Sequence, residues 1–350
     1  LNTVSFDMST IFLCVLNNEL NSLLFIWITL KNDSGLPIPG ISPEKILGVN
    51  SSGISVNKML AKTTSLSHLK TDRACVTPNG ALFKTDSQGF LPEMMETMYN
   101  ERVIYKKRML KAKKEYEKTK DPKLVREISR CHNIQWARKI ALNSAYGAVG
   151  NQYFRYYDVR QASAITTAGQ FIIRFIEEKV NNYLNTILKS EEKLDYIVAS
   201  DTDSIYVTLD KLVEKTCQGK DNDQICNFLD KVVGSRIEPF IEKCFDELSE
   251  YTNAFKNCMV MKREVVANKG IWVAKKRYML NVLDEEGVRL SEPKLKIMGI
   301  EAVKSSTPQV CRGKIKEAIK IIMSKEQKDL HKFIADFKKE FFNMSAEQIS

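Results

Sequence analysis

Apolar and polar positions follow two different periods along the chain, and each period predicts one kind of element. Between residues 162 and 188 the apolar residues recur every three or four positions, which predicts a helix with one face in a core. Two more long helices are predicted, from Glu93 to about Lys120 and from about Lys123 to Tyr146. Asp121-Pro122 separates them, so we expect a projecting helical hairpin.

Shorter apolar runs bounded by turn residues predict strands elsewhere. These runs cover residues 3–7, 23–30, 196–200, 205–209, 259–267 and 270–283, and two further amphipathic helices are predicted at 313–323 and 330–342. Residues 51–71 are polar and are expected to be irregular. The pattern indicates the α+β class: an antiparallel sheet with packed helices and a helical protrusion.

The charge distribution adds a class of partner. The net charge is +10, and residues 99–142 hold 14 Lys and Arg against 5 Asp and Glu, while residues 262–325 hold 15 against 7. Two basic blocks suggest two surfaces that meet a polyanion, although solvated helix faces would give the same charge pattern. Eight cysteines without a C-x-x-C pair and three histidines argue against a disulfide scaffold or a zinc site. No apolar run reaches the roughly 18 residues of a membrane span.

The strongest local motif is the turn Asp201-Thr202-Asp203-Ser204 between two apolar strands. Two carboxylates at i and i+2 at a sheet edge can hold a divalent cation such as Mg²⁺. A calcium-binding EF-hand loop is excluded because Ile205 and Tyr206 occupy positions where that loop needs a ligand and a glycine. An Asp-rich hairpin turn and the D-x-D motif of nucleotide-sugar glycosyltransferases remain as alternatives.

Two other groups of residues could complete a phosphoryl-transfer site. Asp7 ends the first predicted strand, and a second carboxylate from a separate strand could bridge two Mg²⁺ ions. Lys139, Asn143 and Tyr146 lie at i, i+4 and i+7 and therefore share a helix face. Arg102 and Lys106 share a face of the opposing helix and offer further cations, unless they belong to a solvated basic stripe.

These motifs occur together in an order that resembles family B DNA polymerases, and the flanking motifs resemble the replicative polymerases of T-even-type bacteriophages. The motifs that carry the resemblance are the turn at Asp201–Ser204, the strand ending in Asp7, the Lys139–Gly147 helix, and residues 154–158, 164–167, 275–278, 292–299 and 304–308.

The resemblance implies a division into polymerase domains. It implies a palm at residues 1–92, with an insertion at 22–40, fingers at 93–150, the rest of the palm at 151–299 and the truncated start of a thumb at 300–350. The chain is thus expected to be a fragment that lacks the exonuclease domain. The stretch 22–40 could be a translated remnant of an intervening sequence, an assembly error or a surface hairpin.

The resemblance also implies roles for individual residues. Asp7, Asp203 and the backbone carbonyl of Met8 would hold two Mg²⁺ ions, for which Mn²⁺ could substitute, and Asp201 would tune this catalytic site. The implied nucleotide-binding residues are Thr10, Ile11, Phe12, Arg102, Lys106, Lys139, Asn143 and Tyr146. The implied DNA-binding residues are Lys275, Lys276, Arg277, Tyr278 and Lys304.

The implied reaction is template-dependent addition of dNTPs to a primer 3′-OH during viral DNA replication. Its partners would be primer–template DNA, dNTPs, the sliding clamp and replisome proteins of the phage, and a second polymerase chain carrying the exonuclease. The reaction would take place in the cytoplasm of an infected bacterium, and no membrane is expected as a partner. Phe12 stands where the family usually has a Tyr, and Lys262 where the phage relatives usually have an acid. An impaired fragment that only binds primer–template DNA is the main alternative.

Overall fold

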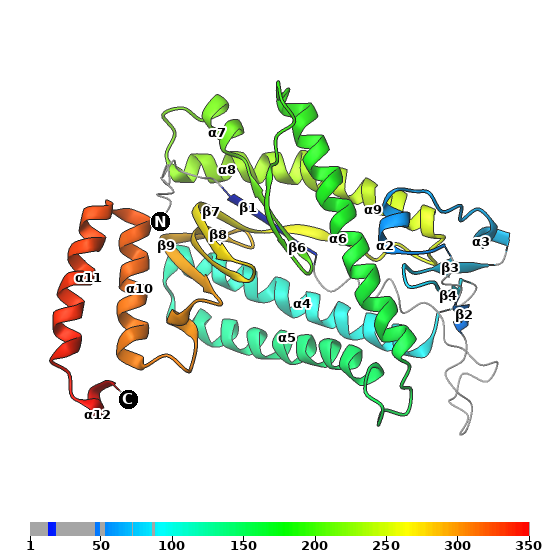
Figure 1. The fold of residues 1–350 in the computed structure, drawn as a ribbon, viewed down its shortest axis with the longest axis horizontal. Helices are drawn as coiled ribbons and strands as arrows, with labels where there is room; N and C mark the ends of the chain where they lie inside the picture. Colours follow the sequence, from blue (N-terminus) through cyan, green and yellow to red (C-terminus); the bar gives the residue numbers. More distant parts are fainter. Residues whose placement is uncertain (1–12, 19–45, 50–52, 72, 86–87, 350) are drawn as a thin grey trace.

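The large sheet confirms the expected α+β class. The computed structural model describes residues 13–18, 46–49, 53–71, 73–85 and 88–349. Six antiparallel strands form the sheet in the order β5-β6-β1-β7-β8-β9 (Figure 1). Their bounds are β5 (Ile197–Asp201), β6 (Ser204–Thr208), β1 (Leu13–Asn18), β7 (Met261–Ala274), β8 (Arg277–Glu285) and β9 (Val288–Met298).

Helices cover one face of this sheet and bury the main core. They are α6 (Val159–Leu188), α8 (Asn222–Val232), η1 (Val233–Ile237) and α9 (Glu238–Thr252), with the short α7 (Asp210–Thr216) beside them. Side chains alternate across β6: Ile205 and Val207 join the cluster that contains Phe171 of α6. Tyr206 points to the other face, where it clusters with Leu280. The sheet is therefore apolar on both faces.

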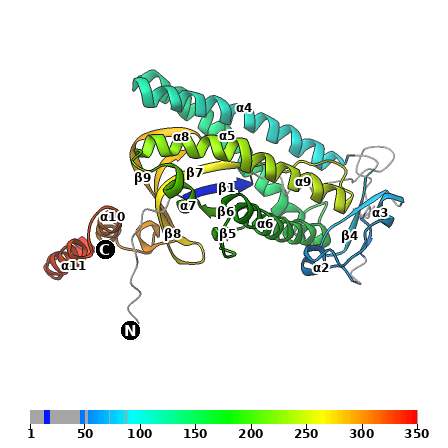
Figure 2. The same ribbon diagram turned by 90° about the horizontal axis from the view of Figure 1, so that it is seen from above.

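The helical hairpin forms as the sequence predicts. It consists of α4 (Phe90–Thr119) and α5 (Pro122–Val149). Lys120 ends α4 in the left-handed conformation, and the Asp121 side chain accepts a hydrogen bond from the Lys123 N–H to begin α5. The hairpin does not project freely as expected: the two helices run along the sheet and α4 contacts β9 (Figure 2).

A smaller sheet and a pair of helices occupy opposite ends of the molecule in Figure 1. The small sheet has the order β2-β4-β3, made of β2 (Ile46–Val49), β3 (Ala74–Val76) and β4 (Ala81–Lys84), with α2 (Val56–Leu60) and α3 (His68–Thr71) beside it. The two short helices correct the expectation that residues 51–71 are irregular. At the other end lie η2 (Glu301–Val303), α10 (Gln309–Ser324), α11 (Gln327–Phe342) and α12 (Ala346–Ile349).

Two strand predictions in the second half of the chain were wrong. The expected strands at 259–267 and 270–283 are instead one long strand, β7, and a second strand, β8, that begins at Arg277 after a turn at Lys275-Lys276. Strand β9 and the helices between 210 and 252 were not expected. The predicted strands at 3–7 and 23–30 and the stretch 22–40 lie outside the described residues.

The remaining expectations about chain chemistry concern cysteines and membranes. Seven of the eight cysteines, those from Cys75 onward, are free thiols, and five of these seven are buried. Within the same described ranges, no helix combines the length and the apolar character that crossing a bilayer requires.

Candidate active site

The Asp201–Ser204 turn lies at the end of the β5–β6 hairpin and is held by its own backbone. The Asp203 N–H donates to the Asp201 carbonyl oxygen at 2.6 Å, and the Ser204 hydroxyl donates to the same oxygen at 3.1 Å. Thr202 has φ = +55°, a conformation that a β-branched residue rarely adopts. Because buried Ile197 and Ile205 fix both strands, the turn presents its two carboxylates at the sheet edge.

Asp203 is the most perturbed carboxylate in this turn. Its side chain is half-buried, and this burial raises its pKa above the ordinary value for an aspartate. The negative charges of Glu264 and Asp201 act in the same direction, while the Lys139 ammonium opposes them. A carboxylate that is desolvated among other carboxylates favours a nearby cation, so the site fits a divalent metal ion. The described residues nevertheless contain no group of three Asp, Glu, His or Cys side chains placed to hold a metal.

Glu264 is a site residue that the sequence analysis missed. It lies on β7, and its carboxylate contacts the Lys296 ammonium of β9 at 3.0 Å. Its charge acts on Asp203 although the two are 61 positions apart in the chain. The sequence feature that could have indicated Glu264 is an acidic residue within an apolar predicted strand. It lies two positions after Lys262, where the phage relatives usually have an acid. Lys262 itself pairs with Glu238 of α9 at 2.9 Å.

The three residues predicted to share a helix face do lie on one helix, α5. Tyr146 packs against the main core, Asn143 is exposed, and Lys139 is half-buried. The Lys139 ammonium lies 5.6 Å from the centre of the exposed Trp136 ring, within range of a cation–π contact. The positive charge of Lys139 also lowers the pKa of Asp203, so helix α5 supplies a cation within the electrostatic range of the carboxylate turn.

Arg102 and Lys106 lie on α4 and face an acid of the β8–β9 turn. The Lys106 ammonium is 2.5 Å from the Glu286 carboxylate. Arg102 is only 4% exposed, and burial lowers the pKa of its guanidinium, while Tyr99 and Glu286 act in the opposite direction. The structure thus pairs Lys106 with Glu286, whose charge also acts on the buried Arg102.

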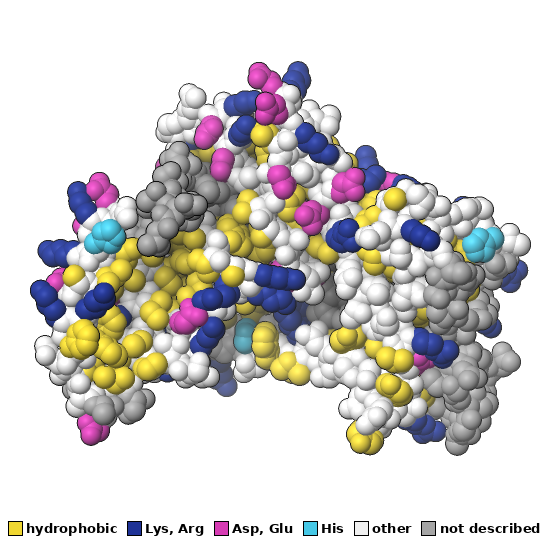
Figure 3. All heavy atoms as spheres, viewed as in Figure 1, with side chains coloured by type: hydrophobic (Ala, Val, Ile, Leu, Met, Phe, Trp, Pro, Cys, Tyr) yellow, Lys and Arg dark blue, Asp and Glu magenta, His cyan; other side chains and the backbone are white. Residues whose placement is uncertain are grey.

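The predicted DNA-binding residues follow the β7–β8 turn. Lys275 and Lys276 are exposed, and the Lys276 ammonium is 3.5 Å from the Asp201 carboxylate, which joins two turns of the sheet. Arg277 contacts Glu301 at 2.6 Å. Tyr278 is buried on one face of the sheet beside Tyr206, and its hydroxyl accepts a hydrogen bond from the Tyr206 hydroxyl at 2.8 Å. Lysine and arginine side chains border a broad hydrophobic area on the face shown in Figure 3.

A glycine beyond β9 fixes the position of this turn, and Lys304 follows it. Gly299 has φ = +65°, and a Cβ atom there would lie 2.2 Å from the Lys276 carbonyl oxygen. Any side chain at position 299 would therefore displace the turn that carries Lys276. Lys304 is exposed and contacts Glu301 at 3.1 Å.

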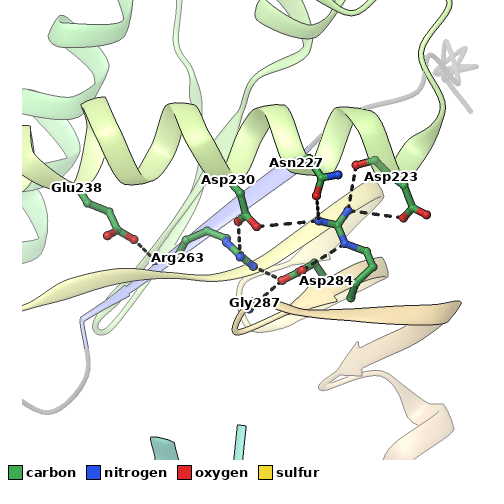
Figure 4. A network of polar contacts seen from close by, with 8 residues as sticks. Asp223, Asn227, Asp230, Glu238, Arg263, Asp284 and Gly287 are labelled. Atoms are coloured by element: carbon green, nitrogen blue, oxygen red, sulfur yellow. Dashed lines mark hydrogen bonds and ion pairs between the residues drawn. The ribbon is translucent and has the colours of Figure 1, made fainter. Parts of the chain in front are cut away.

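An ionic network that reaches from buried Asp284 to the surface supports strands β7, β8 and β9 (Figure 4). Arg263 of β7 pairs with Asp230 of α8 and with Asp284 of β8, and Asp284 is 1% exposed. Arg289 of β9 contacts Asp284 at 3.4 Å and Asp223 of α8 at 3.7 Å. The network joins α8 to three strands, so the β8–β9 hairpin is anchored to the body of the molecule.

Five predicted site residues cannot be placed. Asp7, Met8, Thr10, Ile11 and Phe12 lie outside the described residues. The sheet order nevertheless puts β1, which follows them directly in the chain, between β6 and β7.

Comparison with known proteins identifies the family of this chain. Residues 46–350 match the model of DNA polymerase family B, and the chain belongs to that family. Among its relatives is the DNA-directed DNA polymerase of Escherichia phage RB69, 36% identical over 331 residues, which covers 80% of this chain and 36% of the relative. The DNA-directed DNA polymerase of Enterobacteria phage T4 is 31% identical over 361 residues, covering 89% of this chain and 40% of the relative.

More distant relatives include archaeal enzymes. A DNA polymerase of Pyrococcus glycovorans is 25% identical over 261 residues, covering 70% of this chain and 27% of the relative. The chain therefore spans well under half the length of the curated relatives that it matches.

Proposed function

We propose that this chain carries the catalytic part of a DNA-directed DNA polymerase that adds dNTPs to a primer 3′-OH in viral DNA replication. The observation that carries the proposal is Asp203: a half-buried carboxylate with a raised pKa, on a strained turn, on which the charges of Asp201, Glu264 and Lys139 act. Membership of DNA polymerase family B supports the same reaction.

In this proposal the structural layers correspond to polymerase domains. The palm is the large sheet with its covering helices together with the region before α4, residues 1–92 and 151–299. The fingers are α4 and α5, residues 93–150, and the start of the thumb is residues 300–350. The core supports this division, because most buried apolar residues of α6, α8 and α9 join one cluster with the sheet.

The proposed cofactor is a pair of Mg²⁺ ions, with Mn²⁺ able to substitute. Asp203, Asp7 and the backbone carbonyl of Met8 would hold them, and Asp201, contacted by Lys276, would tune their site. Bound there, such ions would lower the pKa of the primer 3′-OH and neutralise the pyrophosphate that leaves. The raised pKa of the half-buried Asp203 carboxylate, to which the negative charges of Asp201 and Glu264 contribute, fits a cation at this turn.

Other residues would bind and orient the substrates. Lys139, Arg102 and Lys106 would hold the triphosphate, because ammonium and guanidinium groups donate charge-assisted hydrogen bonds to phosphate. Asn143 and Tyr146 would line the nascent base pair, and Thr10, Ile11 and Phe12 would contact the nucleotide from the palm. Primer–template DNA would be held without sequence preference by the residues around the β7–β8 turn and the start of the thumb, Lys275, Lys276, Arg277, Tyr278 and Lys304.

The remaining proposals concern the setting of the reaction. The phage relatives support a role in the cytoplasm of an infected bacterium. A sliding clamp, other replisome proteins and a second polymerase chain that supplies an exonuclease are the proposed partners.

The proposed function is tested by primer extension with Asp203→Asn. Extension of a labelled primer with Mg²⁺ and dNTPs should fall by at least about a thousandfold, because the variant loses a charged ligand in the reaction centre, while the Kd for primer–template DNA stays within about twofold. The matched control is Asp336→Asn, which changes an exposed carboxylate of α11 and should extend normally.

Each variant is measured in the given chain and in a form that lacks residues 22–40. Equal extension by wild type and Asp203→Asn would contradict the proposed role of Asp203. DNA binding without extension in every form would favour the impaired fragment that only binds primer–template DNA.

A further inference from the structure

The β8–β9 turn reaches helix α4 through one acidic side chain. The Glu286 carboxylate lies 2.5 Å from the Lys106 ammonium, and the two side chains are only 23% and 14% exposed. Partial burial reduces the screening of this ion pair by solvent. The neighbouring acid of the same turn, Glu285, pairs instead with Lys294 at 3.1 Å. Only one of the two carboxylates is therefore directed at α4.

The turn is built in a way that fixes Glu286. Glu286 and Gly287 have φ values of +54° and +77°. The Glu286 N–H donates to the Glu264 carbonyl oxygen at 2.6 Å, and the Gly287 N–H donates to the Asp284 carboxylate at 2.9 Å. Asp284 is in turn held by Arg263 in the ionic network. The β8–β9 turn that carries Glu286 is thus fixed to the backbone of Glu264 on the neighbouring strand β7.

The charge of Glu286 also acts on Arg102, which lies one helical turn before Lys106 on α4 and is 4% exposed. Burial lowers the pKa of the Arg102 guanidinium, and the negative charge of Glu286 opposes this effect. Of the two α4 cations assigned to the triphosphate, Lys106 therefore pairs directly with a carboxylate of the protein itself, and Arg102 lies within the electrostatic influence of the same carboxylate.

The rest of the contact between α4 and this hairpin is polar and incomplete. The Ser291 hydroxyl contacts Glu117 at 3.2 Å and Lys120 at 3.4 Å. Beside these contacts, a cavity of about 770 Å³ separates the end of α4 from the start of α8 and from β9. A contact made of ion pairs and hydrogen bonds around a cavity loses little apolar burial when it opens, so α4 can part from the hairpin.

We propose that Glu286 is an internal competitor of the nucleotide triphosphate. Its carboxylate pairs with Lys106 and acts electrostatically on Arg102 when no nucleotide is bound, and the triphosphate of an incoming nucleotide displaces it. This inference rests on the proposed role of Arg102 and Lys106 as triphosphate ligands. The competition makes nucleotide binding weaker than the cations alone would allow, and it ties nucleotide arrival to release of α4 from the palm.

The test measures binding of sodium tripolyphosphate and of a dNTP to the complete chain by calorimetry, which needs no catalysis. Glu286→Gln keeps the shape of the side chain and removes its charge, so both ligands should bind roughly three- to tenfold more tightly. Glu285→Gln is the matched control from the same turn and should stay within twofold of wild type. Adding Lys106→Met to Glu286→Gln should remove most of the gain, because the released cation is then missing.

The outcomes separate this inference from the proposed function. Unchanged or weaker binding by Glu286→Gln would overturn the competition, and so would the absence of tripolyphosphate binding in every variant. Tighter binding by Glu286→Gln would support it even if the chain extended no primer. If primer extension depends on Asp203 but Glu286→Gln binds both ligands as tightly as wild type does, the proposed polymerase function stands and the proposed competition is wrong. Thermal unfolding followed by circular dichroism checks that each variant is folded.

Discussion

Helices α4 and α6 are both 30 residues long, yet the molecule uses them in opposite ways. Helix α6 buries ten residues, nine of them apolar, and its apolar face lies in the main core. Helix α4 buries six residues, and one of these is Arg102. Its start joins the main core through Leu91, while farther along it meets the β8–β9 hairpin through polar contacts such as Lys106 with Glu286. Two helices of equal length therefore differ in role: α6 stabilises the core, whereas α4 is weakly attached and carries cationic side chains.

The largest effect that this comparison predicts is on α6. Phe171→Ala removes a side chain that is 2% exposed, and the lost burial and the resulting cavity should lower the free energy of unfolding by about 3–5 kcal/mol. Urea unfolding followed by circular dichroism measures it. Glu178→Ala, at an exposed position of the same helix, should change stability by less than about 0.5 kcal/mol. A loss below about 1 kcal/mol for Phe171→Ala would mean that α6 is not the structural element described.

The helical hairpin should show the reverse behaviour. Lys139→Ala should raise the KM for dNTP by about tenfold or more, because a charged partner of the triphosphate is lost, while unfolding and the Kd for primer–template DNA change little. Steady-state primer extension and DNA-binding titrations measure both quantities. Lys123→Ala, at the exposed start of the same helix, is the control. Equal increases in the KM for dNTP and in the Kd for primer–template DNA would assign Lys139 to the DNA duplex instead.

The smallest predicted effect concerns the attachment of α4 near its start. The Lys256 ammonium contacts Glu96 at 2.5 Å, and this hydrogen bond, with a second one from Gln88, lowers the pKa of Glu96. A carboxyl with a lowered pKa in the folded state stabilises the protein above its unfolded pKa, and this contribution is lost as the pH falls through the folded value. Between about pH 5 and pH 3, wild type should therefore lose stability more steeply than Glu96→Gln, by up to roughly 1 kcal/mol.

The measurement for Glu96 is urea unfolding across this pH range. Glu93→Gln, which removes an exposed carboxylate in the first turn of the same helix, should leave the wild-type slope in place. Identical slopes for wild type and Glu96→Gln would show that the Lys256 contact does not stabilise the start of α4.

Periodicity was sufficient to predict the long helices, but it misplaced the turn between β7 and β8. The turn residue Lys276 has φ = +62°, and a lysine gives no turn signal of the kind that Gly, Asn or Pro would. Strand β9, which was not expected, contains Pro293, and it lies at the edge of the sheet, where a missing N–H is tolerated. Both errors arise because strand pairing within the sheet determines where these strands begin and end, and the local sequence does not show that pairing.

The site was predictable only where its residues are neighbours in sequence. Asp201 and Asp203 share a turn, and Lys139 and Asn143 share a helix face, so spacing alone grouped them. The charge of Glu264 acts on Asp203 from β7, which lies in the same sheet, and Glu286 meets Lys106 through the packing of a helix on a hairpin. No local pattern encodes such contacts, because they depend on the tertiary arrangement of elements far apart in the chain.

The central place of β1 in the large sheet has a consequence for how the chain folds. Leu13 pairs with Thr208 on one side and with Ala267 on the other, so the sheet stays divided until β6 and β7 have been synthesised. Contacts between such distant positions form slowly, because a long loop must close first. The α4–α5 hairpin contains only local contacts and can form on the ribosome while β1 still lacks both partners. During that interval β1 has two unpaired edges, which makes it the segment on which a chaperone or an aggregating neighbour would act.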